Sequence, residues 1–227
     1  MLMRRLRRLL GRLSGNSSGV AMTEFALSLP FMMTAGLWGV ELANYALINM
    51  RVSQIAMQLA DNASRIGDTS NLDNRKIYEA DINDLLLGAS LQGGNRLEFF
   101  EHGRAIISSL EVHPDHDDDR QYIAWQRCMG KKNYDSSYGV EGDGADGSLD
   151  GMGPEDEEVI AFEGEAVMFV EVAYDYQALI SPTFVGEPEI RSISSFTVRS
   201  DRDLSQIYQR PSASDPVARC DVYVNTV

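Results

Sequence analysis

The stretch Gly19-Val20-Ala21-Met22-Thr23-Glu24-Phe25 leads into an apolar run from Ala26 to Val40, and together these segments decide the fold. From Phe25 to Met50 the only formal charge is Glu41. The segment upstream of the stretch has no acidic residue and carries five arginines: Arg4, Arg5, Arg7, Arg8 and Arg12. A basic flank followed by one apolar helix is typical of a single-span membrane protein whose arginine side stays in the cytoplasm. We therefore expect a transmembrane helix at residues 20–50 and export of everything after Arg51.

The length of the apolar run sets the expected depth of its two carboxylates. The uncharged interval from Phe25 to Val40 corresponds to about 24 Å of helix, and extension to Met50 gives about 39 Å, against a hydrocarbon core of about 30 Å. Glu24 is thus expected near the cytoplasmic boundary and Glu41 near the outer one. Pro30 removes one backbone hydrogen bond and is expected to kink the helix, a defect that membrane helices tolerate.

A lone carboxylate five residues after a glycine, at the cytoplasmic end of an apolar run, resembles a type IV prepilin leader. The resemblance implies a basic leader at residues 1–19, cleavage between Gly19 and Val20, and Glu24 as the fifth mature residue. An ordinary secretory signal has the reverse order, with the apolar run before the cleavage site and removed. Serine and glycine around the bond are expected to keep the backbone extended and accessible to a peptidase.

The resemblance narrows to the TadE-like minor pseudopilins of tight-adherence (Tad/Flp) pilus systems. It is carried by Glu24-Phe25-Ala26-Leu27-Ser28-Leu29-Pro30 and by Glu41-Leu42, and it covers residues 19 to about 66 closely. The segment from Ala124 to Gly130, with the sequence AWQRCMG, and the stretch around Glu171 to Tyr174 resemble the family more loosely.

The resemblance implies a pilin-like protein of the bacterial inner membrane, with a cytoplasmic N-terminus and a periplasmic C-terminal domain. An aspartic prepilin peptidase would cut after Gly19, and the product would help to start or support an adhesive Tad pilus. The implied partners are the peptidase, other pilins or pseudopilins, the inner-membrane pilus platform and the lipid bilayer.

Glu24, with Phe25 and Pro30 beside it, is the expected assembly region of the helix. The resemblance implies that the new ammonium group at Val20 of one subunit pairs with Glu24 of its neighbour, because both ions would otherwise be desolvated alone. The alternative is that Glu24 stays hydrated at the membrane surface. Two other classes of function also remain: an uncleaved single-span periplasmic scaffold of a pilus or secretion machine, and a tethered periplasmic binding or metal-dependent module.

The charge balance argues against nucleic acid as a partner. The formal net charge is −14, from 20 basic and 34 acidic residues. Removal of the five-arginine leader leaves 15 basic residues, so the mature chain would carry 15 − 34 = −19. Nucleic-acid binding needs a basic face, and this balance also argues against an exported domain that lies on anionic lipid.

Cys128 and Cys220 are the two cysteines, and both follow the membrane span. In an oxidising periplasm such a pair is expected to form a disulfide, which would stabilise the fold by roughly 4 to 5 kcal/mol on the chain-entropy model. The alternative is two separate buried thiols.

The exported part, residues 51–227, is predicted to form an α+β domain with an antiparallel sheet. A stripe at helical spacing predicts that one helix continues from about Val20 to Ile66, about 70 Å, and packs its outer half on the domain. The residues of the stripe are Ile48, Val52, Ile55, Leu59, Ala63 and Ile66.

A second helix is predicted from Arg75 to about Ala89, with a turn at Gly93-Gly94-Asn95. Strands are predicted at 104–112, 121–126, 159–162, 166–176 and 190–199. The segment 165–175 is apolar on both faces and is expected to be a central strand that the helix covers on one side.

Two acidic segments favour solvated loops over ligand sites. Residues 113–119 contain two histidines and four aspartates, but a polar hairpin loop supplies neither the fixed geometry nor the supporting contacts of a metal site. Residues 135–158 are acidic and glycine-rich without a basic residue, and they miss the order of a calcium loop because position 145 is alanine. We expect a mobile surface insertion there. We predict no metal, no cofactor and, since no histidine has a persuasive serine or cysteine partner, no enzyme activity.

Overall fold

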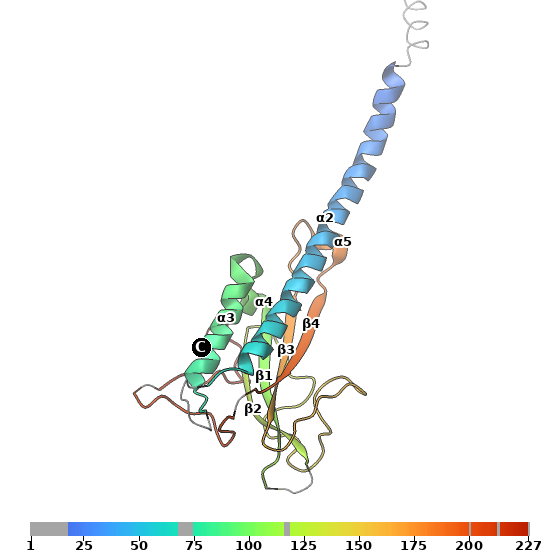
Figure 1. The fold of residues 1–227 in the computed structure, drawn as a ribbon. Helices are drawn as coiled ribbons and strands as arrows, with labels where there is room; N and C mark the ends of the chain where they lie inside the picture. Colours follow the sequence, from blue (N-terminus) through green and yellow to red (C-terminus); the bar gives the residue numbers. More distant parts are fainter. Residues whose placement is uncertain (1–17, 68–74, 116–118, 200, 213, 227) are drawn as a thin grey trace, which may run out of the picture.

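A computed structural model describes residues 18–67, 75–115, 119–199, 201–212 and 214–226. The first helix of the described residues, α2 (Ser18–Ala63), is continuous over 46 residues, which corresponds to a length of about 69 Å. Pro30 lies inside α2 without interrupting it. The first half of α2 projects away from the domain, and the second half lies along it (Figure 1). The predicted single helix from about Val20 to Ile66 is therefore confirmed, with ends shifted by two to three residues.

The second half of α2 is buried along the predicted stripe. Its core residues are Val52, Ile55, Ala56, Leu59, Ala60 and Ala63, and each of them is at most 3% exposed. Ile48 and Ile66 pack against the same core from its two ends. Because the spacing of these residues follows the helical repeat, one face of α2 becomes a wall of the domain.

Four antiparallel strands form one sheet in the order β2-β1-β3-β4. They are β1 (Gly103–Val112), β2 (Gln121–Met129), β3 (Ala166–Asp175) and β4 (Glu189–Thr197). β3 pairs with both β1 and β4, and α2 packs across β3 and β4 on one face of the sheet. The α+β class, the antiparallel sheet and a central β3 covered by the helix are confirmed.

The acidic segment 135–158 and the residues after it lie over the opposite face of the sheet. Met152 is fully buried and packs with Val167 and Phe169 of β3, and Ala161 joins the same cluster. The backbone of the segment is irregular apart from a bridge between Met152 and Val159. The acidic insertion therefore also covers the sheet, while its mobility stays a prediction.

The predicted strand at 159–162 is wrong. Val159 bridges only to Met152, and the main-chain groups of Ala161 bond to a side chain instead of a strand. The Gln121 amide accepts from the Ala161 N–H at 2.7 Å and donates to the Ala161 carbonyl at 3.2 Å. A side chain of β2 thus takes the hydrogen bonds that a neighbouring strand would need.

The predicted second helix is displaced toward the C-terminus. It is α3 (Glu79–Leu97), and it begins later because the Asp81 carboxylate accepts a hydrogen bond from the Tyr78 N–H and caps the first turn. Gly94 departs from helical geometry with φ 67°, so the predicted glycine turn appears as a kink within α3. The described part of the chain also contains two short helices, α4 (Phe99–His102) and α5 (Pro182–Val185).

Candidate functional site: the exposed stem and its junction with the domain

The first half of α2 has no packing partner among the described residues. Every side chain from Gly19 to Val40 is exposed, and this segment is called the stem below. The stem would span about 33 Å, close to the thickness of a hydrocarbon core of about 30 Å. Within the described part of the chain, α2 is the one helix that is long and apolar enough to cross a membrane. From Glu41 onward one face of α2 is covered by the domain, so the uncovered part is shorter than the predicted span of residues 20–50.

The expected cleavage and assembly residues all lie on the stem. Gly19 and Val20 are in the first turn of α2, so the expected extended backbone around this bond is not found. The physical reason is local, because the apolar residues after Val20 favour the helix and nothing in the first turn breaks it. The first four N–H groups of a helix have no intrahelical acceptor, so this turn opens at low cost. A Cβ added at Gly19 would contact nothing within 4 Å.

Polar side chains on the stem are of two kinds. The hydroxyl groups of Thr23, Ser28 and Thr34 donate to carbonyls three or four residues earlier in α2, at 2.7 to 3.1 Å. Such bonds satisfy a hydroxyl in an apolar environment without another chain. Glu24, by contrast, has no hydrogen bond or ion pair with any residue that the structure describes.

Glu41 directly follows the stem, at the point where α2 meets the domain. Its carboxylate is 0% exposed and accepts a hydrogen bond from the Tyr176 hydroxyl at 2.5 Å. It also accepts from three consecutive backbone N–H groups after β3: Leu179 at 2.9 Å, Ile180 at 2.7 Å and Ser181 at 3.4 Å. A buried carboxylate with four donors is well compensated for its loss of water.

Further polar groups extend this junction to α3. The Asn44 Nδ2 donates to the Tyr176 hydroxyl at 2.7 Å, and an Arg96 Nη2 donates to Asn44 Oδ1 at 3.1 Å. The Tyr45 ring packs edge-on against the Tyr176 ring at 5.1 Å between centroids. Burial and the Glu41 carboxylate raise the pKa of Tyr176, which keeps its hydroxyl protonated as a donor. The junction thus joins α2, the segment after β3 and α3.

Sequence reasoning placed Glu41 only by its depth and missed its partners. The available signal was that Glu41 is the one charge between Phe25 and Met50. Its hydrogen-bond partners follow 135 to 140 residues later, and no local pattern marks Tyr176 or the Leu179 to Ser181 segment as its complement.

The C-terminal tail is fastened to β2 by the predicted disulfide. Cys128 and Cys220 are bonded, and no free cysteine remains in the chain. The backbone adds two hydrogen bonds, from the Cys128 N–H to Ala218 O at 2.8 Å and from the Gly130 N–H to Val224 O at 2.7 Å. The loosely matching segment from Ala124 to Gly130 therefore lies where the tail attaches.

Arg104 holds the same tail from the neighbouring strand β1. Its buried guanidinium donates to the carbonyls of Gly130, Val222 and Cys220 at 2.6 to 3.1 Å, and the Tyr223 ring stacks over it. Gly130 has φ +128°, and a Cβ there would lie 2.1 Å from Gly103 O. Only glycine therefore fits at this close contact between the two backbones. Burial lowers the pKa of Arg104 below its ordinary value.

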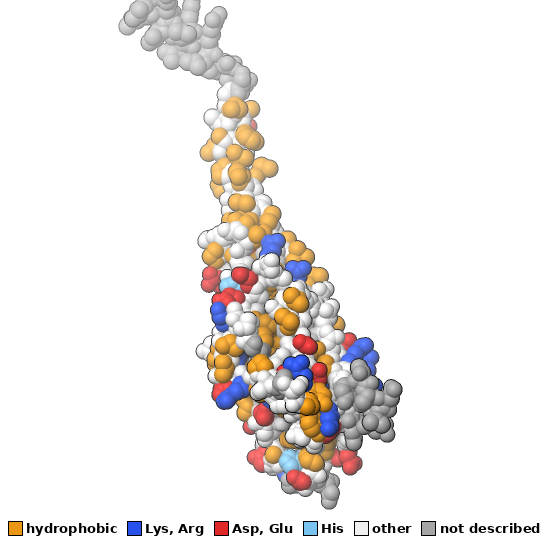
Figure 2. Space-filling view, turned by 90° about the vertical axis from the view of Figure 1, so that its left-hand side faces the viewer, with side chains coloured by type: hydrophobic (Ala, Val, Ile, Leu, Met, Phe, Trp, Pro, Cys, Tyr) orange, Lys and Arg blue, Asp and Glu red, His pale blue; other side chains and the backbone are white. Residues whose placement is uncertain are grey.

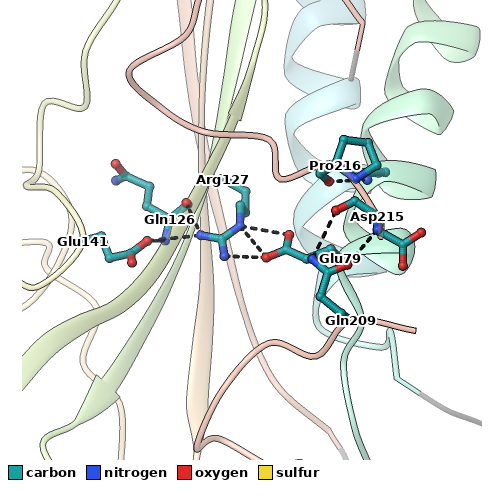
Figure 3. Close-up of polar contacts among 8 residues, drawn as sticks. Glu79, Gln126, Arg127, Glu141, Gln209, Asp215 and Pro216 are labelled. Carbon is teal, nitrogen blue, oxygen red and sulfur yellow. Dashed lines mark hydrogen bonds and ion pairs between the residues drawn. The ribbon is translucent and has the colours of Figure 1, made fainter. Parts of the chain in front are cut away.

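A second polar cluster ties β2 to α3 and the tail (Figure 3). Arg127 on β2 makes a bidentate pair with Glu79 in the first turn of α3, with a shortest distance of 2.6 Å, and reaches Glu141 at 3.2 Å on its other side. Beside it, Gln209 and Asp215 exchange two hydrogen bonds. These contacts join the start of α3, β2 and the tail within one chain.

The acidic loop at 113–119 lies partly outside the described residues, since residues 116–118 are not described. Within the described chain, no group of three His, Cys, Asp or Glu side chains is placed to hold a metal ion. The remaining histidine, His102, lies near Glu98 at 3.7 Å on the surface.

Comparison with known proteins adds no relative. No family model, no curated protein and no solved structure matches this chain.

Proposed function

We propose that this chain is a minor pseudopilin that takes part in the assembly or initiation of a Tad/Flp-type adhesive pilus. It would be inserted with its N-terminus in the cytoplasm and its domain in the periplasm, and cut after Gly19 by a prepilin peptidase. The observation that carries the proposal is the fully exposed apolar stem, residues 19–40, attached to the domain by the buried carboxylate of Glu41. A stem of this kind needs lipid or other helices around it, and a pilus subunit uses both in turn.

The first test is the N-terminus of the mature protein. Protein extracted from membranes of cells with an active prepilin peptidase should begin at Val20, and protein from cells without the peptidase should keep residues 1–19. Gly19→Ala should block processing, because the peptidase site requires glycine before the cut. Gly36→Ala is the matched control, since an added Cβ there also contacts nothing within 4 Å, and it should be processed normally.

The second test separates processing from assembly. Glu24→Ala should leave cleavage largely intact and impair pilus formation, because the ammonium group at Val20 of the neighbouring subunit would lose its partner. Thr23→Ala is the control, since its hydroxyl bonds only to its own helix. Normal pili from Glu24→Ala would rule out the pairing.

The second candidate function is an uncleaved single-span scaffold of a pilus or secretion machine. The helical first turn of α2 favours it, because this turn, although it opens at low cost, must open before a peptidase can bind Gly19 and Val20 as an extended segment. A full-length N-terminus in a strain with active peptidase would establish the scaffold and overturn the pseudopilin proposal.

A further inference from the structure

The end of the domain from which the stem emerges exposes apolar side chains on a second element. The segment between β3 and β4 contains α5, which contacts α2 and lies beside it in Figure 1. In this segment Leu179 is 50% exposed and Ile180 is 39% exposed. These two residues bind Glu41 through their backbone N–H groups. Glu41 therefore fixes the backbone that presents both side chains at the base of the stem.

A basic hollow of about 290 Å³ lies beside the same junction, between α2 and the C-terminal end of α3. Arg51 and Arg96 line it together with Asn44 and Leu47. Neither arginine pairs with a carboxylate among the described residues, and Glu98, close to Arg96 in the chain, lies near His102 instead. Helical side chains incline toward the helix N-terminus, so Arg51 on α2 leans toward the stem. Figure 2 shows basic side chains at the neck of the domain, directly below the apolar stem.

The dimensions of the stem set the depth of these groups in a bilayer. A stem of about 33 Å fills a hydrocarbon core of about 30 Å, which leaves Glu41 at the boundary of the core. Arg96 is bonded to Asn44, three residues beyond Glu41 or about 5 Å along the helix. The headgroup layer is about 5 to 8 Å thick on each side, so the Arg96 guanidinium is at the depth of the lipid phosphates. The backbone of Arg51 lies farther out, about 15 Å beyond Glu41 along the helix, but its side chain reaches back to the hollow that it shares with Arg96 and Asn44, at the outer edge of that layer.

We propose that Leu179, Ile180, Arg51 and Arg96 form a membrane-docking collar, in which the two apolar side chains enter the bilayer interface and the arginines bind the phosphate of an anionic lipid headgroup. This inference rests on the membrane-spanning part of the proposed function. Without the five-arginine leader the chain carries a net charge of 15 − 34 = −19, which repels the rest of the domain from an anionic surface, so the contact is confined to the collar. Docking would fix the angle between the domain and the membrane while the subunit is in the bilayer, before pilus assembly.

The depth of the collar can be measured in the full-length chain reconstituted into liposomes that contain brominated lipid. In a Trp38→Phe background, the tryptophan introduced by Ile180→Trp should be quenched by bromine near the interface. Phe162→Trp, at an exposed apolar side chain in the segment after the acidic insertion, is the matched control and should not be quenched. Trp125, only 8% exposed within the sheet, supplies a constant background in every variant.

The headgroup contact is tested by the lipids that co-purify with the chain from bilayers that mix phosphatidylcholine and phosphatidylglycerol. The wild-type chain should retain phosphatidylglycerol above its bulk ratio, and Arg51→Gln with Arg96→Gln should remove this preference, with about a fivefold loss for each arginine. Arg65→Gln with Arg219→Gln makes the same change in net charge on exposed arginines outside the collar and should keep the preference.

The outcomes separate this inference from the proposed function. If Trp38 of the wild-type chain is quenched but the tryptophan introduced by Ile180→Trp is not, the stem spans the membrane and the collar does not dock. If Trp38 is not quenched either, the membrane span itself fails. The introduced tryptophan can also become buried from solvent without being quenched by bromine. If this burial increases with the protein-to-lipid ratio and does not depend on the anionic lipid, the collar binds a second copy of the chain, and the lipid proposal is overturned.

Discussion

Glu41 shows how one buried charge can set the geometry of a long helix. Its carboxylate leaves water to meet four donors, three of which belong to consecutive residues of one backbone segment. Because these N–H groups point to one place, the carboxylate fixes both the position and the direction of that segment relative to α2. The stem can therefore leave the domain at a defined angle.

Tyr176→Phe tests the strength of this junction. The change removes one donor from Glu41 and the acceptor of Asn44, so it should lower the free energy of unfolding by about 1 to 2 kcal/mol. Glu41→Gln should cost more, because its amide group would face backbone donors with a donor of its own. Urea unfolding of the detergent-solubilised chain, followed by circular dichroism, measures both variants. Tyr223→Phe, which removes an exposed hydroxyl bond to Asp135, is the control and should change little.

Glu111 on β1 is a buried carboxyl group that makes stability depend on pH. Its residue is 2% exposed, and burial raises its pKa from about 4.5 to about 7 despite a hydrogen bond from Ser109 and the positive charge of Arg202. Between these two pH values the folded chain keeps a proton that the unfolded chain has lost. Stability therefore falls as pH rises through this window and levels off above it.

Glu111→Gln should remove most of that slope. The wild-type chain is expected to lose about 2 to 3 kcal/mol of unfolding free energy between about pH 4.5 and 7, and the variant much less. Burial also raises the pKa of Glu171, which adds to the slope in both proteins. Urea unfolding at a series of pH values measures the difference, and equal slopes for the two proteins would contradict the assignment to Glu111.

At the scale of elements, the sheet and the second helix are joined by an ion pair as well as by the core. The Glu79 side chain is 4% exposed and the Arg127 side chain 13%, so the pair is largely shielded from water. Glu79 also lies in the first turn of α3, where the helix dipole favours a negative charge. The pair thereby fixes the start of α3 against β2, the edge strand of the sheet.

Arg127→Gln should release this contact. It leaves Glu79 buried without a cation, which is expected to cost about 2 to 4 kcal/mol, somewhat below a fully buried pair because of the dipole. Arg65→Gln breaks an exposed pair with Asp61 and should cost less than about 1 kcal/mol. Chemical unfolding of the two variants gives the comparison. Similar losses of unfolding free energy would show that the Arg127 pair stabilises the fold no more than an exposed pair does.

At the scale of the whole molecule, the irregular tail is held by the disulfide and by Arg104. The bond joins residues 92 positions apart, so it closes a large part of the chain into a loop in the unfolded state. Cys128→Ser with Cys220→Ser should lower the free energy of unfolding by about 4 to 5 kcal/mol on the chain-entropy model. Thermal unfolding with and without reductant checks this: the wild-type chain should respond to reductant, and the double variant should not.

The sequence by itself determined the long helix, its apolar first half and its packed second half, the α+β class and the cysteine pair, whereas the point at which the domain begins to cover the helix, Glu41 and not residue 51, came from the structure. These follow from local periodicity, from the distribution of charge and from the number of cysteines, which need no knowledge of distant contacts. The assembly role of Glu24 and cleavage at Gly19 stay predictions, because they depend on other molecules.

Only the tertiary structure decided which residues meet Glu41, that Gln121 replaces a strand at Ala161, and that the acidic insertion covers the sheet. Each of these contacts joins residues that are far apart in the chain. Local propensity cannot select them, because the energy of a buried polar group depends on the donors and acceptors that the whole fold brings to it.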